Sequence, residues 1–175
     1  MSDSLATRIY ERAHLEGEFR LRSGAVSHEY FDKYRFESDP TLLGEIARLM
    51  SDLLPADVEL LAGLELGGIP LATALSQATG IPAVFVRKQA KTYGTCRLAE
   101  GGEIAGRRLV IIEDVVTSAG QIIESCRELR NLRAVVSTAV CVIDREAGGA
   151  ENLARERVDL RPLLTMRQLQ AAARQ

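Results

Sequence analysis

Apolar positions along the chain fall into two patterns, short continuous runs and helical stripes. The runs of aliphatic, often β-branched residues predict buried strands. They lie at residues 58–62, 83–86, 109–112 and 135–143. Apolar residues that recur every three or four positions predict helices. One predicted helix begins after Asp39-Pro40 and ends before Pro55, and two others cover 69–78 and 122–129. Because strands alternate with helices, we expect an α/β fold with a mostly parallel, twisted sheet flanked by helices.

The first forty residues do not follow this alternation. They contain a helical stripe over 5–16 and two short strands, 19–23 and 26–31, around a turn at Ser23-Gly24. We expect them to form a small hood beside the sheet rather than a domain of their own. The chain is therefore expected to be a single domain over 1–175, with a hood at 1–40 and an α/β core at 41–165.

Composition narrows the class of protein. The 175 residues are 46% hydrophobic, which suits one globular domain, and the net charge of −2 argues against general binding to nucleic acid or membranes. The sequence contains no apolar run of membrane-spanning length, and its first residues lack the apolar core of a signal peptide. Cys96, Cys126 and Cys141 are too few and too scattered for a disulfide framework or a zinc site. We expect a cytoplasmic protein.

The most informative run is residues 109–121, where an apolar strand leads into Glu113 and Asp114 and then into a loop with Thr117 and Ser118. In open α/β sheets, ligands bind beyond the carboxyl ends of strands, and a helix N-terminus offers free N–H groups to an anion. The two carboxylates would repel a phosphate beside them but would accept hydrogen bonds from ribose hydroxyls. The run thus predicts a ribose 5-phosphate site. The alternative is an ordinary strand–helix unit with an acidic turn, as in receiver-like domains.

A second loop of this kind lies at residues 63–68, between a strand and a helix. Gly67 and Gly68 let backbone N–H groups approach a ligand, so this loop is a candidate for a second phosphate group. Alternatively, the glycines serve the geometry of a tight turn.

Residues 87–97 contain four basic residues and no acid. Only three of the 22 basic residues of the chain are Lys, and Lys88 and Lys91 are two of them. A cationic exposed segment after a strand suits a lid over a polyanion, which would neutralise a leaving group. The alternative is a solvated basic loop. The third lysine, Lys33, is expected on the surface, and His14 and His28 receive no role.

Several motifs resemble known ones. Residues 109–121 resemble the signature of the type I phosphoribosyltransferases, which bind phosphoribosyl pyrophosphate (PRPP). Four further stretches are similar to the orotate phosphoribosyltransferases of that family, and they occur in the same order over about residues 17–149. They are Gly17–Gly24, Tyr30–Asp32, Arg87–Gly94 and Val142–Arg145.

The resemblance implies the site residues. Lys88, Lys91, Glu113 and Asp114 would be catalytic, the two acids holding the ribose. The 5-phosphate would bind at 117–121. PRPP would contact Arg22, Gly67, Gly68, Arg87, Lys88, Lys91, Tyr93, Glu113, Asp114, Val115, Val116, Thr117, Ser118, Ala119, Gly120 and Gln121. Orotate would contact Tyr30, Phe31, Thr117 and Arg145.

The sequence departs from the family at four positions. Tyr93 stands where many members have His, Glu113 where many have Asp, and Arg22 where Lys is frequent. Gly67 replaces a Lys of some members, so a pyrophosphate contact there would come from backbone. Tyr93 can donate a hydrogen bond but, unlike a protonated imidazole, supplies no cation to the lid.

The resemblance implies conversion of orotate and PRPP to orotidine 5′-monophosphate and pyrophosphate, in pyrimidine biosynthesis. Mg²⁺ would be held mainly by substrate and water rather than by protein side chains. A homodimer is implied, with the lid of one subunit closing over the site of the other. The alternatives are a phosphoribosyltransferase for another base, such as a purine, and a non-catalytic regulator that senses PRPP or a nucleotide.

Overall fold

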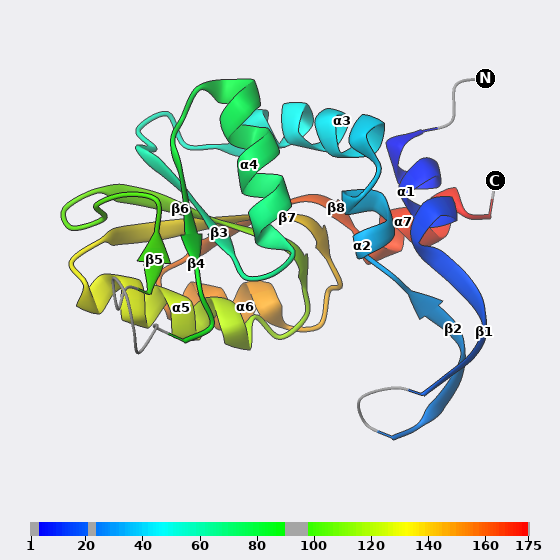
Figure 1. Cartoon of the computed structure of the whole chain (residues 1–175). Coiled ribbons are helices and arrows are strands. Elements are labelled where there is room, and N and C mark those ends of the chain that lie inside the picture. The colour runs from blue at the N-terminus through cyan, green and yellow to red at the C-terminus, as the bar shows by residue number, and fades with distance from the viewer. Residues whose placement is uncertain (1–3, 21–23, 90–97, 175) are drawn as a thin grey trace.

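The structure, a computed structural model, describes residues 4–20, 24–89 and 98–174 (Figure 1). Helices and strands follow one another along the chain as α1 (Leu5–Ala13), β1 (His14–Arg20), β2 (Val26–Phe31), α2 (Tyr34–Glu37), α3 (Pro40–Met50), the 3₁₀ turn η1 (Ser51–Leu53), β3 (Leu60–Leu64), α4 (Gly68–Thr79), β4 (Ala83–Val86), β5 (Ala99–Glu100), β6 (Arg108–Val116), α5 (Gly120–Asn131), β7 (Val135–Asp144), α6 (Gly149–Arg155), β8 (Asp159–Thr165) and α7 (Met166–Ala172).

A six-stranded sheet forms the centre, in the order β5-β4-β3-β6-β7-β8. Neighbouring strands are parallel except for β5, which runs antiparallel to β4. The chain moves outward from β3 to β4 and then returns to place β6 on the other side of β3. The carboxyl ends of β3 and β6 therefore flank a topological switch point, where α/β sheets bind their ligands.

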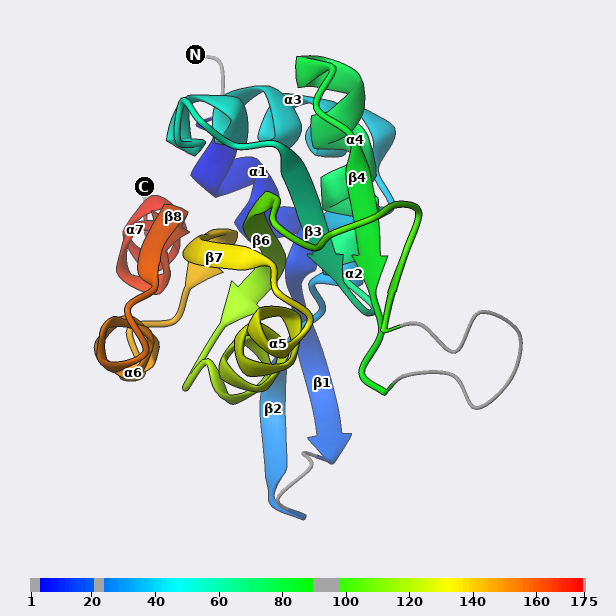
Figure 2. The same cartoon turned by 90° about the vertical axis from the view of Figure 1, so that its left-hand side faces the viewer.

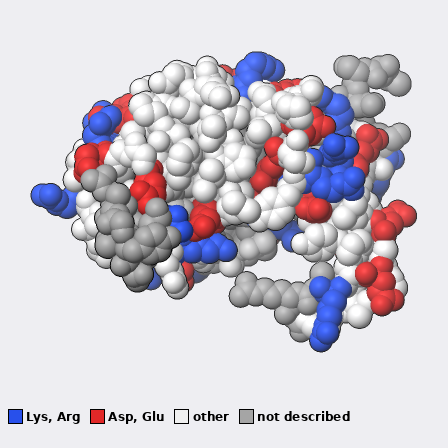
Figure 3. Space-filling view, in the orientation of Figure 1, with Lys and Arg blue, Asp and Glu red and all other residues white. Residues whose placement is uncertain are grey.

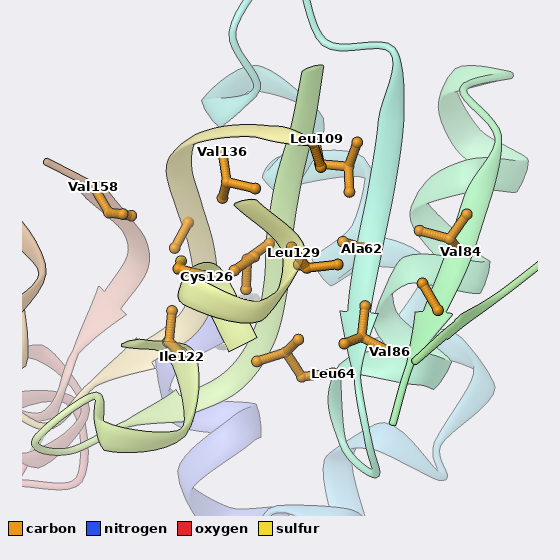
Figure 4. Packing of buried hydrophobic residues seen from close by; sticks show 14 of the residues in the cluster. Ala62, Leu64, Val84, Val86, Leu109, Ile122, Cys126, Leu129, Val136 and Val158 are labelled. Atoms are coloured by element: carbon orange, nitrogen blue, oxygen red, sulfur yellow. The ribbon is translucent and has the colours of Figure 1, made fainter. Parts of the chain in front are cut away.

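Alternating side chains of the strands fill two hydrophobic cores, one on each face of the sheet. Leu60, Ala62 and Leu64 of β3 belong to the core beneath α5 and α6, which Figure 4 shows from close by. Leu61 of β3 belongs to the opposite core, with residues of α1, α3, α4 and α7. Figure 1 shows α3 and α4 on one face and α5 and α6 on the other. The expected α/β architecture with helices on both faces is thus present.

The N-terminal residues form a hairpin that stands apart from the sheet. Strands β1 and β2 pair antiparallel in a two-stranded sheet of their own, and Figures 1 and 2 show this hairpin projecting away from the body. Helix α1 packs against α7, and Ile9 and Ala13 on α1 are completely buried. The hood is therefore anchored on the C-terminal helix, while its hairpin reaches outward.

Several predicted elements have different bounds. The strand expected over 58–62 is β3 at Leu60–Leu64, and the strand expected to begin at residue 19 is β1, which begins at His14. The helix expected over 5–16 ends at Ala13, because His14, Leu15 and Glu16 pair with β2 instead. The strand expected to end at Ile112 continues to Val116, because pairing with β7 extends to Val116 opposite Asp144. The two acidic residues that we placed after the strand therefore lie inside it. Among the described residues, no helix is long and apolar enough to span a membrane.

Candidate active site

Most of the predicted site residues lie at one edge of the sheet. Because β3, β4, β6 and β7 are parallel, the loops that follow them emerge at the same edge, as Figure 1 shows. These loops carry Gly67 and Gly68, the start of the basic segment, Thr117 and Ser118, and Arg145. The topology thus brings together motifs that are far apart in the sequence.

The acidic pair on β6 is more buried than the sequence suggested. Glu113 is half-buried and Asp114 is completely buried. The Asp114 backbone N–H donates to Glu113 Oε1 at 3.1 Å, and the Val115 N–H donates to Asp114 Oδ1 at 2.5 Å. Burial, followed by the nearby charge of Asp114, raises the pKa of Glu113 to about 8. Near neutral pH, Glu113 therefore carries a proton when no ligand is bound.

Lys33 is not the free surface residue that we expected. It follows β2, its side chain is 33% exposed, and its Nζ lies 2.5 Å from Asp114 Oδ2. Glu37, on α2, is 5% exposed and faces the same carboxylate. Burial, with the charge of Asp114, raises the pKa of Glu37 to about 9. The scarcity of lysine in the chain was the signal that could have singled out Lys33.

The glycines after β3 are required by the packing of the loop on β6. A Cβ at Gly67 would come within 1.6 Å of Asp114 Oδ2, and one at Gly68 within 2.2 Å of the Ile112 carbonyl oxygen. The loop is also tied to the basic segment, because the Lys88 backbone N–H donates to Glu65 Oε2 at 3.0 Å. Helix α4 begins at Gly68 without a capping side chain. At this helix start the Ile69 N–H donates to the Leu66 carbonyl oxygen at 3.2 Å and Pro70 has no N–H, so the N–H groups of Gly67 and Gly68 are the ones that can meet a ligand.

The loop between β6 and α5 presents a second helix N-terminus. Ala119 has a φ of 64° and precedes α5, which has no side-chain cap. Asn152 Nδ2 donates to the Ser118 carbonyl oxygen at 3.1 Å, and a Cβ at Gly149 would lie 2.5 Å from the Thr117 carbonyl oxygen. Contacts from α6 thus hold the loop in place. Thr117 and Ser118 are exposed, so their hydroxyls and the first N–H groups of α5 can meet an anion.

A pocket of about 250 Å³ lies between the hairpin, α7 and the end of β7. It contains three of the four residues expected to contact orotate, Tyr30, Phe31 and Arg145, but its lining does not include Thr117. Both acids beside Arg145 are engaged elsewhere. Asp144 Oδ1 accepts from the Glu146 N–H at 2.9 Å, and Glu146 pairs with Arg167 at 2.8 Å. The pocket is lined by Tyr10, His14, Ser27, Glu29, Tyr30, Phe31, Arg145, Met166 and Gln170.

Three predicted site residues, one in the hood and two in the lid, lie outside the described residues. They are Arg22, Lys91 and Tyr93. At the start of the basic segment, Arg87 is half-buried and Lys88 is exposed. Within the described ranges, no group of three or more His, Cys, Asp or Glu residues is arranged to hold a metal ion.

Comparison with known proteins identifies the family. Residues 35–159 match the family described as a phosphoribosyl transferase domain. The chain belongs to the phosphoribosyltransferase family. An orotate phosphoribosyltransferase from a Nocardioides species is 52% identical to this phosphoribosyltransferase over 169 residues, which are 97% of the chain and 94% of the relative.

Solved structures confirm the predicted fold class of this phosphoribosyltransferase. The orotate phosphoribosyltransferase of Mycobacterium tuberculosis, in complex with Fe(III) dicitrate, superposes with a TM-score of 0.86 at 32% identity and covers 94% of this chain and 96% of its own. The same enzyme in complex with PRPP has a TM-score of 0.81 at 29% identity, and the match covers 95% of this chain and 96% of that enzyme. The match to the family begins on α2, so the hairpin with Tyr30 and Phe31 lies before it.

Proposed function

We propose that this phosphoribosyltransferase is an orotate phosphoribosyltransferase that joins orotate to PRPP and releases pyrophosphate, in pyrimidine biosynthesis. Similarity to orotate phosphoribosyltransferases over nearly the whole chain carries this proposal. The pocket that contains Tyr30, Phe31 and Arg145 supports it from the geometry. A purine enzyme would not need a guanidinium there to grip a substrate carboxylate.

PRPP would bind along the edge of the sheet, from the N-terminus of α5 to that of α4. Its 5-phosphate suits the exposed loop and helix start at 117–121, which follow Val115 and Val116. The ribose hydroxyls suit Glu113 and Asp114, and the pyrophosphate suits the backbone at Gly67 and Gly68. The basic residues Arg22, Arg87, Lys88 and Lys91, with Tyr93, would surround the pyrophosphate from the lid and hood.

The reaction replaces one bond at the anomeric carbon of the ribose. The bond to a pyrophosphate oxygen breaks, a bond to a ring nitrogen of orotate forms as that nitrogen releases its proton to pyrophosphate or water, and positive charge develops on the sugar. The protein then has to hold the two substrates in line, exclude water and stabilise the departing pyrophosphate. Backbone N–H groups at two helix starts and the cations Arg87, Lys88 and Lys91 of the closed lid would supply this stabilisation.

Mg²⁺ is expected with PRPP. Asp114 already pairs with Lys33, so a metal held mainly by substrate oxygens and water fits this site better than a protein cage. When bound, the ion would neutralise part of the pyrophosphate charge.

Orotate would lie in the pocket beneath the hairpin. Arg145 can hold its carboxylate through two parallel hydrogen bonds, because the neighbouring acids are occupied by other partners. Tyr30 and Phe31 would pack beside the ring, with Thr117 on the side of the ribose.

We further propose a cytoplasmic homodimer of single-domain subunits, each with its hood at 1–40 and core at 41–165. Helix α4 contains no charged side chain, and Figure 3 shows a largely uncharged surface over it. Such a face suits a symmetric interface, where each charge near the axis would meet its own copy. The lid of one subunit would close over the site of its partner.

The test is the loss of orotate ultraviolet absorbance on mixing the protein with PRPP and Mg²⁺. We expect a loss that requires both PRPP and Mg²⁺ and that falls sharply in Arg145→Gln, while Arg48→Gln, at an exposed position on α3, serves as the matched control. Such a loss of absorbance would support the proposed reaction, and the role of each residue would then be tested by substitution. If PRPP binds by calorimetry but orotate is unchanged, the proposal fails, and purine bases or a PRPP-sensing role would be tested next.

A further inference from the structure

A buried group of one cation and three acids joins the hood to strand β6. It consists of Lys33 and Glu37 on the hood side and Glu113 and Asp114 on β6, and we call it the lysine–acid group. Its closest contact is the 2.5 Å ion pair between Lys33 Nζ and Asp114 Oδ2. Asp114 is 0% exposed and Glu37 5% exposed, so water does little to screen this group.

Two of the three acids hold protons near neutral pH. Burial is the largest cause that raises the pKa of Glu37 to about 9 and that of Glu113 to about 8, and the charge of Asp114 adds to both. Burial also works to lower the pKa of Lys33, but its hydrogen bond to Asp114 and the charge of that residue outweigh burial and raise the pKa. The ion pair between Lys33 and Asp114 is therefore the charged part of the group.

The same carboxylate oxygen supports the phosphate loop. Asp114 Oδ2 forms the ion pair with Lys33 and also fills the space that a Cβ at Gly67 would need, 1.6 Å away. A buried carboxylate without a counterion would take up a proton or turn toward water. Either change would alter the acid that faces the ribose and the surface on which the Gly67 loop rests.

We propose that Lys33 is a positioning residue for PRPP, which holds Asp114 as an oriented carboxylate beneath the Gly67 loop. Lys33 acts through Asp114 and does not touch the reacting atoms. This inference rests on the proposed function, because it gives Asp114 its role toward the ribose.

The experiment compares Lys33→Met with the unchanged full-length chain. We expect the Kd and KM for PRPP to increase about tenfold or more, whereas the KM for orotate changes by less than about threefold. Lys33 lowers the pKa values of Glu37 and Glu113, so its removal should move the acid limb of the kcat/KM profile to higher pH. Tyr34 also faces the ion pair of Lys33 and Asp114, and it is kept as tyrosine in this variant.

Two variants separate positioning from mere stability. Lys33→Arg keeps the charge and should restore PRPP affinity to within about threefold. Arg127→Met removes the cation of an exposed ion pair with Glu156 on the far side of α5, and it should leave all constants unchanged. If Lys33→Met does not fold, Lys33→Gln replaces it, because glutamine still donates to Asp114 but carries no charge.

Two outcomes would overturn this inference, and a third would refute the proposed function instead. A folded Lys33→Met that binds PRPP with the original affinity and pH profile overturns it. Failure of Lys33→Arg to restore affinity also overturns it, since it would show a structural role alone. Calorimetry with PRPP needs no orotate, so Lys33 is tested even if the unchanged chain binds PRPP but does not convert orotate, which would refute the proposed function instead.

Discussion

The space above the Asp114 carboxylate decides which residue can stand at position 67. The sequence suggested that Gly67 allows backbone to approach a phosphate, which is a property of the loop itself. The structure adds a steric reason from another strand, because a Cβ there would overlap Asp114 Oδ2. No local pattern reveals this contact, since the two residues meet only when β3 and β6 are adjacent in the sheet.

Gly67→Ala should therefore impair PRPP binding. The added methyl group must displace either Asp114 or the loop, so we expect kcat/KM for PRPP to fall about 100-fold, together with a lower melting temperature. Steady-state rates and thermal unfolding measure both effects. The control is Gly44→Ala on α3, where a Cβ meets no heavy atom within 4 Å, and it should gain up to about 1 kcal/mol of stability. Equal behaviour of the two variants would contradict the steric account.

Glu37 should make the protein less stable as pH rises. Its pKa is about 9 in the folded chain, against an ordinary value of 4.5. Below pH 4.5, Glu37 is protonated in both the folded and the unfolded chain, so its contribution to stability is fully present. Between the two values the unfolded chain ionises while the folded chain keeps its proton, and the contribution to stability is lost.

Urea unfolding at pH 5, 7 and 9 measures this loss. We expect the free energy of unfolding to fall by about 2 kcal/mol or more between pH 5 and pH 9, and Glu37→Gln to reduce that fall. Glu124→Gln, which removes an exposed acid on α5, is the control and should keep the original pH dependence. A Glu37→Gln curve parallel to that of the unchanged chain would show that Glu37 is ionised in the folded state.

At the scale of elements, the sequence was reliable where apolar runs were bounded by strong signals. Strand β4 has the predicted bounds, and α3 begins at Pro40 with Asp39 accepting from the N–H groups of Thr41 and Leu42. The C-terminal elements were missed for a physical reason. Pro162 and Arg161 argue against a central strand, but β8 lies at the edge of the sheet, where proline is tolerated.

The extent of β6 shows what tertiary pairing adds. We ended this strand where the apolar run stops, yet Val115 pairs with Ile143 on β7, and the strand carries both acids with it. The signal available in the sequence was the β-branched pair Val115 and Val116, which directly follows the two acids. Motifs were enough to predict candidate site residues, whereas the burial and ionisation of these residues depend on neighbours from other elements.

The N-terminus of α5 gives a prediction at this scale. Ser118→Asp places a negative charge beside the first turn, which favours the helix dipole but opposes a phosphate. We expect stability to stay within about 1 kcal/mol of the original, whereas PRPP affinity should fall more than about tenfold. Calorimetry and thermal unfolding measure the two effects. Ser137→Asp on the exposed start of β7 is the control for the added charge, and normal PRPP binding by Ser118→Asp would rule out this helix start as the 5-phosphate site.

At the scale of the molecule, apolar and ionic contacts both join the hood to the rest of the chain. Helix α1 packs against α7, Arg8 on α1 pairs with Glu45 on α3, and Lys33 pairs with Asp114. The expectation of a hood beside the sheet came from a break in the strand–helix alternation. The ion pair of Lys33 was missed, because a single lysine between a hairpin and a short helix has no periodic pattern around it.

Subunit mixing tests the proposed sharing of lids between partners. Lys91→Ala removes a cation from the lid, and Asp114→Asn neutralises the acid beside the ribose, so each variant alone should have very low activity. In a mixed dimer, the intact lid of the Asp114→Asn subunit would close over the intact core of the Lys91→Ala subunit. One site in each mixed dimer would then be complete.

If equal amounts of the two variants exchange at random, half of the dimers are mixed, and activity should recover to about a quarter of that of the unchanged protein. The measurement is the rate of orotate loss after subunit exchange, with sedimentation to establish that the particle has twice the 19.1 kDa mass of the chain. Because a lid that closes over its own subunit leaves both sites of the mixed dimer defective, a mixture that stays as inactive as its components would show closure within one chain.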